Sequence, residues 1–172
     1  MQGYLALILH AHLPFVRHPE YPEFLEEDWL FEAVAETYLP LLEAYEGLWR
    51  DGIDFRVSMT LSPPLVSMLR DPLLQERCAE RLRRLIELAE DEVERHKDHG
   101  HLHYLAGWYR DLLTRRLYQY ETLYGRDLAA AFRTFQDRGR LEILTCCATH
   151  GFLPMLSAYE PAVRAQVRVA VE

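Results

Sequence analysis

The hydrophobic and polar positions of the chain follow two kinds of pattern. Short, mainly apolar runs predict three strands, over residues 4–12, 55–61 and 141–148. Between them, stretches with an apolar side chain every three or four positions predict amphipathic helices, over residues 28–50, 72–99, 102–124 and 128–138, with a last helix from 160 onward. The run of residues 4–9 is of the kind that is buried on both faces of a parallel sheet.

Proline and glycine indicate where these elements begin and end. Pro40 lies inside a helical pattern and should kink or split that helix, because proline removes a backbone hydrogen bond. Asp71 followed by Pro72 is typical of a helix start, and Pro14 marks the end of the first strand. Four glycines are expected to end helices: Gly52, Gly100, Gly125 and Gly139.

The order of the predicted elements is strand, helix, strand, several helices, strand, helix. Strands that alternate with helices are typical of an α/β protein with a parallel sheet, and here they favour the first three β/α units of a barrel. Residues 72–139 exceed what a minimal crossover needs, so we interpret them as a helical insertion between the second and third strands. Three strands cannot close a barrel, so residues 1–172 are expected to be the N-terminal portion of a larger, truncated domain.

Composition narrows the class of protein. Hydrophobic residues make up 49% of the 172 and charged residues 27%, as in a globular domain. The 19 basic and 27 acidic residues give a net charge of −8, which argues against a nucleic-acid partner and is compatible with a neutral substrate. No signal peptide or membrane span is recognisable, which predicts a cytoplasmic protein without a membrane partner. The three cysteines, Cys78, Cys146 and Cys147, lack a CxxC spacing and are expected to be buried free thiols.

His10 and His12 lie at the end of the first strand, on the same face of it as Ala6 and Ile8. The carboxyl ends of parallel strands are where open sheets and barrels hold their ligands. The two imidazoles are candidates for binding a metal ion, or for binding sugar hydroxyls or a catalytic carboxylate. The structural alternative is a pair of histidines hydrogen-bonded to loop carbonyls, which we favour less because polar rings on an apolar face are costly.

Other candidates are weaker. His150 follows the third strand, and this position at a strand end makes it a candidate functional residue. Trp29, near the loop after His12, is a candidate platform for a sugar ring, whereas the tyrosines recur at helical spacing and favour core packing. Glu142 lies at the start of its strand, the wrong end for a barrel active site. Four further histidines favour an exposed helix end over a metal site: His96, His99, His101 and His103.

Three motifs at strand ends carry a resemblance to a known family: residues 10–15 (HAHLPF), 61–65 (LSPPL) and 148–154 (ATHGFLP). With them the chain resembles glycoside hydrolase family 57, and within it the 1,4-α-glucan branching enzymes. The resemblance implies an incomplete (β/α)7 barrel and a retaining mechanism without metal or cofactor, in which a cleaved α-glucan segment is passed to a 6-hydroxyl, as in glycogen synthesis. It places His10 and His12 in the subsite next to the cleaved bond, with His150 close by.

The resemblance also implies that the catalytic residues lie elsewhere. A glutamate nucleophile and an aspartate acid/base are expected C-terminal to Glu172, so this chain alone should be inactive. The motifs leave amylase and glucanotransferase activity open, and nothing in the sequence indicates an oligomeric state. Two other functions also stay open: a metal-dependent hydrolase such as a polysaccharide deacetylase or an α-mannosidase, and a non-catalytic glucan-binding module.

Overall fold

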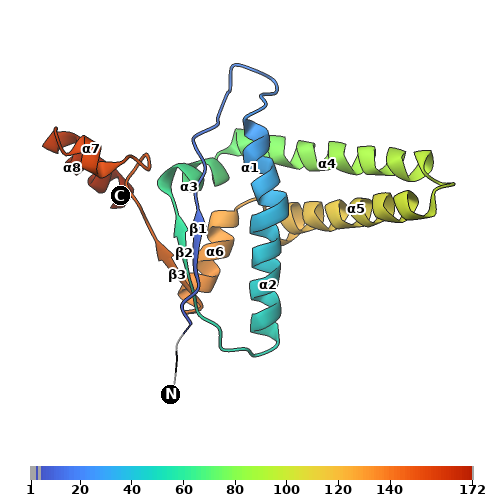
Figure 1. Ribbon diagram of the computed structural model, residues 1–172, viewed down its shortest axis with the longest axis horizontal. Helices are drawn as coiled ribbons and strands as arrows, with labels where there is room; N and C mark the ends of the chain where they lie inside the picture. Colours follow the sequence, from blue (N-terminus) through green and yellow to red (C-terminus); the bar gives the residue numbers. More distant parts are fainter. Residues whose placement is uncertain (1–2, 4, 172) are drawn as a thin grey trace.

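The computed structural model describes residues 3 and 5–171 and has an α/β fold (Figure 1). Three parallel strands form one sheet in the order β1-β2-β3. The strands are β1 (Ile8–Ala11), β2 (Val57–Leu61) and β3 (Leu141–Leu144). The helices are α1 (Glu27–Ala33), the π-helical η1 (Val34–Tyr38), α2 (Leu39–Arg50), α3 (Pro63–Leu69), α4 (Pro72–Arg95), α5 (Gly100–Tyr118), the π-helical η2 (Gln119–Leu123), α6 (Leu128–Asp137), α7 (Leu153–Leu156) and α8 (Glu160–Val171).

The hydrophobic core lies between the sheet and the helices that pack on one of its faces. Helices α2, α3, α6 and the first half of α4 supply most of the buried side chains. The rest of α4 extends away from them with α5 as a long antiparallel pair (Figure 1). Because side chains alternate along a strand, every second strand residue meets this core. Those that do are Leu9, Ala11, Val57, Met59, Leu61, Leu141 and Ile143.

The opposite face of the sheet is open in the described chain, which corrects the expectation that the first strand is buried on both faces. On this face Ile8 of β1 is 64% exposed and Leu144 of β3 is 36% exposed. The reason is that the helices cover only one side of the sheet. Tyr4, with which the predicted strand begins, lies outside the described residues.

The strands are also shorter than predicted. The pairing of β2 with β3 ends at Thr60 and Leu144, because β2 turns into α3 from Pro63. The predicted strand residues 145–148 therefore have no partner and form a loop. The cysteines in that loop, Cys146 and Cys147, are half-buried, so the expectation of three buried thiols holds only for Cys78.

Most helix signals act as predicted. The first helix is interrupted by η1 just before Pro40, which sits in the first turn of α2. The Asp71 carboxylate caps α4, accepting from the Leu73 and Leu74 amides at 3.0 and 3.1 Å. The expected turn glycines adopt positive φ at Gly52, Gly125 and Gly139.

Other boundaries differ from the prediction. Helix α4 ends at Arg95 rather than at residue 99, and Gly100 begins α5 instead of ending α4. The short helices α3 and α7 were not predicted, because the prolines in them were interpreted as marking the end of a strand or a loop. In α3, Pro63 and Pro64 occupy the first turn, where a helix needs no amide donor. Glu172, at the end of the last predicted helix, lies outside the described residues.

The loop between β1 and α1 is fixed by a buried ion pair. The Glu27 carboxylate lies 2.6 Å from the Arg77 guanidinium of α4 and also accepts from the His18 amide at 3.0 Å. Arg77 in turn donates to the carbonyls of His18 and Tyr21. These bonds satisfy a carboxylate that would be costly to bury alone. They hold the segment that follows His12 in place.

Within the part of the chain that the structure describes, no helix has the length and apolar character needed to cross a membrane.

Candidate functional site

Three histidines from opposite ends of the chain meet at the carboxyl end of the sheet. Strand β1 and the residue after it bring His10 and His12, and the loop after β3 brings His150. The His12 and His150 rings stack, with centroids 3.8 Å apart and planes at 14°. The His10 ring lies 5.6 Å from that of His150 and 6.3 Å from that of His12. We call these three residues the histidine cluster.

Hydroxyl groups of β2 and its end position two of the rings. The His10 Nδ1 lies 2.7 Å from the Thr60 hydroxyl, and the His12 Nδ1 lies 2.8 Å from the Ser62 hydroxyl. The Thr60 hydroxyl also accepts from the Ala11 amide at 3.2 Å. Since Nδ1 of both rings is engaged, Nε2 is the nitrogen placed to meet a ligand.

His12 is held toward its neutral form. Burial of the ring, followed by the neighbouring His150 and His10, lowers the pKa of His12 below its ordinary value. A neutral imidazole carries one donor and one acceptor nitrogen. It therefore suits uncharged polar groups such as sugar hydroxyls.

His150 has an unusual backbone conformation. Its φ is +56°, in the left-handed region, which costs a non-glycine residue about 1–2 kcal/mol. The turn is closed by the His150 amide, which donates to the Cys147 carbonyl at 2.8 Å, and by the Cys147 thiol, which donates to the Gly151 carbonyl at 3.0 Å. Residues in a strained backbone conformation persist only where the surrounding structure holds them in it, and they are concentrated at ligand-binding sites.

A cavity of about 500 Å³ adjoins the cluster, within the range of small-molecule sites. His12 and His150 lie in its lining, with Pro14 and Phe15 from the loop after β1. The remaining lining residues are Pro63, Pro64, Ser67, Ala148, Thr149 and Val169. The cavity therefore combines two imidazoles with an aromatic ring and prolines, a surface that suits a sugar.

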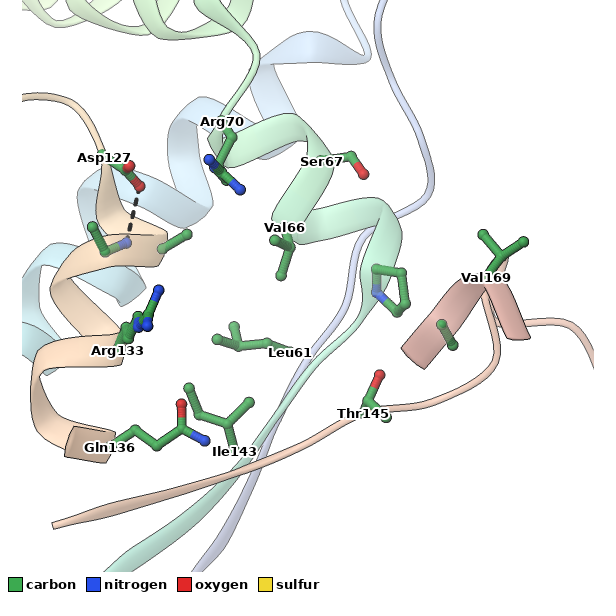
Figure 2. Close-up of a pocket in the computed structure, with 14 residues that line it drawn as sticks. Leu61, Val66, Ser67, Arg70, Asp127, Arg133, Gln136, Ile143, Thr145 and Val169 are labelled. Atoms are coloured by element: carbon green, nitrogen blue, oxygen red, sulfur yellow. Dashed lines mark hydrogen bonds between the residues drawn. The ribbon is translucent and has the colours of Figure 1, made fainter. Parts of the chain in front are cut away.

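A second cavity, of about 490 Å³, lies next to the first and shares Pro63, Ser67 and Val169 with its lining (Figure 2). Its floor is formed by Leu61 and Ile143 from the helix-covered face of the sheet, and Arg70 and Arg133 lie at its rim. None of the three histidines lines it. We therefore place the candidate site in the cavity beside His12 and His150.

The other candidates are not part of this arrangement. Trp29 is 51% exposed on α1 and does not line the cavity. Glu142 bonds to the Ser58 hydroxyl at 2.6 Å, toward the amino end of the sheet. In the other group of histidines, at the end of the α4–α5 pair, His96 pairs with Glu92 and His103 bonds to the Val93 carbonyl.

A metal site is not favoured by the geometry. The lone pairs of the stacked His12 and His150 rings lie in nearly parallel planes and do not converge on one point. Among residues 3 and 5–171, no group of three histidine, cysteine or acidic side chains is arranged to hold a metal ion.

Thr60 and Ser62 were missed at the sequence level. The signal was present in residues 57–62 (VSMTLS), where small polar side chains alternate with apolar ones. Such alternation predicts one face on the core and one polar face.

Comparisons with known proteins identify the family of the chain. The family model for glycosyl hydrolase family 57 matches residues 6–172, which include all three histidines. The chain belongs to glycosyl hydrolase family 57. A curated 1,4-alpha-glucan branching enzyme of Thermococcus kodakarensis is 35% identical over 97% of the chain.

Solved family 57 structures share the fold. The alpha-amylase AmyC of Thermotoga maritima superposes with a TM-score of 0.91 and is 45% identical over 99% of this chain. The family 57 branching enzyme of Thermococcus kodakarensis gives a TM-score of 0.86 at 34% identity, and that of Pyrococcus horikoshii 0.83 at 33%, each over 99% of this chain. The chain spans 24% of the curated branching enzyme and 30–32% of the three solved chains.

Proposed function

We propose that this chain forms the histidine-bearing wall of an α-glucan site in a family 57 branching enzyme. The observation that carries the proposal is the histidine cluster, in which three rings from two strand ends meet beside a cavity. In this proposal the sheet is the first part of an incomplete (β/α)7 barrel, and residues 72–139 are a helical insertion into it.

The proposed role of the histidines is to bind rather than to cleave. Their Nε2 atoms hydrogen-bond hydroxyls of the glucose unit next to the bond that is broken. Retaining glycosidases need two carboxylates about 5–5.5 Å apart, and no carboxylate lines the cavity within the described residues. We propose that the glutamate nucleophile and the aspartate acid/base come from later family segments, so that this chain alone does not process glucans.

Branching is favoured over hydrolysis by the motifs described above and by the curated branching enzyme that spans nearly the whole chain. The similarity to an alpha-amylase makes hydrolysis the outcome to test against. Amylose should be treated with the native protein that contains this chain. New α-1,6 signals in the NMR spectrum with few new reducing ends support branching, whereas reducing ends without α-1,6 signals contradict it.

The binding role can be tested on the chain itself by calorimetric titration with maltoheptaose. We expect His12→Ala to weaken binding about tenfold, because a hydrogen bond and a ring contact are lost. His101→Ala, which removes an exposed histidine far from the cluster in sequence, is the matched control and should bind normally. Unchanged affinity in His12→Ala and His10→Ala would point instead to a glucan-binding surface elsewhere. Branching of amylose by these 172 residues alone would contradict the predicted inactivity.

A further inference from the structure

Helix α8 returns to the loop that carries His150 and is bonded to it through one residue. The Gln166 side chain accepts from the Thr149 amide at 3.0 Å and donates to the Thr149 hydroxyl at 2.8 Å. The Gln166 backbone carbonyl accepts from the Ala148 amide at 3.0 Å. Three hydrogen bonds from a single residue therefore hold the two residues immediately before His150.

Hydrophobic packing contributes little to this attachment. Within the described residues, neither α7 nor α8 contains a fully buried side chain. Close contact is nonetheless present at Gly151, where an added Cβ would lie 3.0 Å from Leu156 Cδ1 and 3.7 Å from Gln166 Cδ. The loop is thus fixed by polar contacts at Thr149 on one side of His150 and by a close approach at Gly151 on the other.

We infer that Gln166 is a positioning residue of the histidine cluster, which acts through Thr149 to hold the left-handed turn that stacks His150 on His12. Without the two side-chain bonds to Thr149, only the hydrogen bonds at Cys147 and the backbone bond to the Ala148 amide remain to offset the strain at His150, and the turn relaxes toward an ordinary conformation. The His150 ring then leaves His12. The expected effect on glucan affinity rests on the proposed function, whereas the effect on ring stacking does not.

The test is Gln166→Ala in the native protein that contains this chain, read by NMR of the imidazole groups and by maltoheptaose titration of the same samples. Alanine is the stronger helix former, so α8 itself should persist. The titratable groups around His12 are His10 from β1 and His150 from the loop, and no acidic or basic residue other than the histidines lines the cavity. We expect the ring-current shift between His12 and His150 to disappear and the pKa of His12 to rise toward its ordinary value. Affinity for maltoheptaose should fall about fivefold.

Two further variants separate positioning from general stability. Gln166→Glu keeps two acceptors for the Thr149 amide and hydroxyl, and should restore the ring-current shift. Arg168→Ala, at an exposed position on the same helix, is the control and should leave the histidine signals unchanged. A lower melting temperature in Gln166→Ala with unchanged histidine signals would mean a purely structural role and would overturn the inference. If the signals change as expected but the native protein that contains this chain binds no maltoheptaose, the positioning role stands and the proposed function fails.

Discussion

The two faces of the sheet use the same three strands for different purposes. On the helix-covered face, Leu9, Met59 and Ile143 lie side by side across the strands and contact the core. On the open face the neighbouring positions carry polar groups that bond to one another. These contacts are Ser58 with Glu142 and Thr60 with His10, and they continue just past the strand ends with Ser62 and His12.

The difference between the faces shows how a short sheet can support both a core and a site. Alternation along each strand assigns the odd-numbered positions of β1 and β2 to packing and the even-numbered positions to the open face, where all of them except Ile8 make polar contacts. Burial stabilises one face and hydrogen bonds order the other. Substitutions on the two faces should therefore affect different measurements, stability on one and ligand binding on the other.

The largest expected effect is on the covered face. Met59 is 2% exposed at the centre of β2, and Met59→Ala should lower the free energy of unfolding by about 2–5 kcal/mol, because it leaves a cavity in the core. Denaturant unfolding measures this change. Ser58→Ala, the adjacent residue on the open face, is the control, with an expected loss within about 1 kcal/mol. Equal losses from the two variants would mean that the faces do not differ in this way.

A smaller effect is expected at the boundary between the faces. Ser62 is 1% exposed and supplies the hydroxyl that bonds His12 Nδ1. Ser62→Ala should weaken maltoheptaose binding about threefold, because the His12 ring loses its anchor but keeps its stacking on His150. Titration calorimetry gives the affinity. A loss as large as that of His12→Ala would indicate that Ser62 itself contacts the glucan.

The smallest effect concerns pH. The pKa of His12 is lowered in the folded state. At pH values between this lowered pKa and the ordinary one, the unfolded chain therefore binds more protons at His12 than the folded chain does. Stability is therefore complete above the ordinary histidine pKa of about 6.5 and declines as the pH falls below it. The melting temperature measured from about pH 8 to about pH 5 should decline more for the unmodified chain than for His12→Asn. Parallel declines would show that His12 does not contribute.

The sequence predicted the parts of this arrangement that depend on local order. The spacing of His10 and His12 placed both on one face at a strand end, and Asp71 with Pro72 marked the start of α4. The exposure of one face of the sheet could not be predicted from the sequence, because an apolar run does not indicate whether helices cover one side of the sheet or both. The stacking of His150 on His12 depends on how the crossover from β2 to β3 closes, which no local pattern encodes.

The loose attachment of α8 has a consequence for how the site responds to a ligand. Elements with few buried contacts open locally at a small free energy, and their amides exchange hydrogen with solvent faster than those of core strands. We expect that, in this chain by itself, local opening of α8 separates His150 from His12 while β1 and β2 remain paired, so that only the closed form has the complete cluster. If the proposed function holds, a glucan that contacts both His12 and His150 binds only the closed form. The apparent affinity is reduced by the closed fraction, and bound glucan slows exchange in α8.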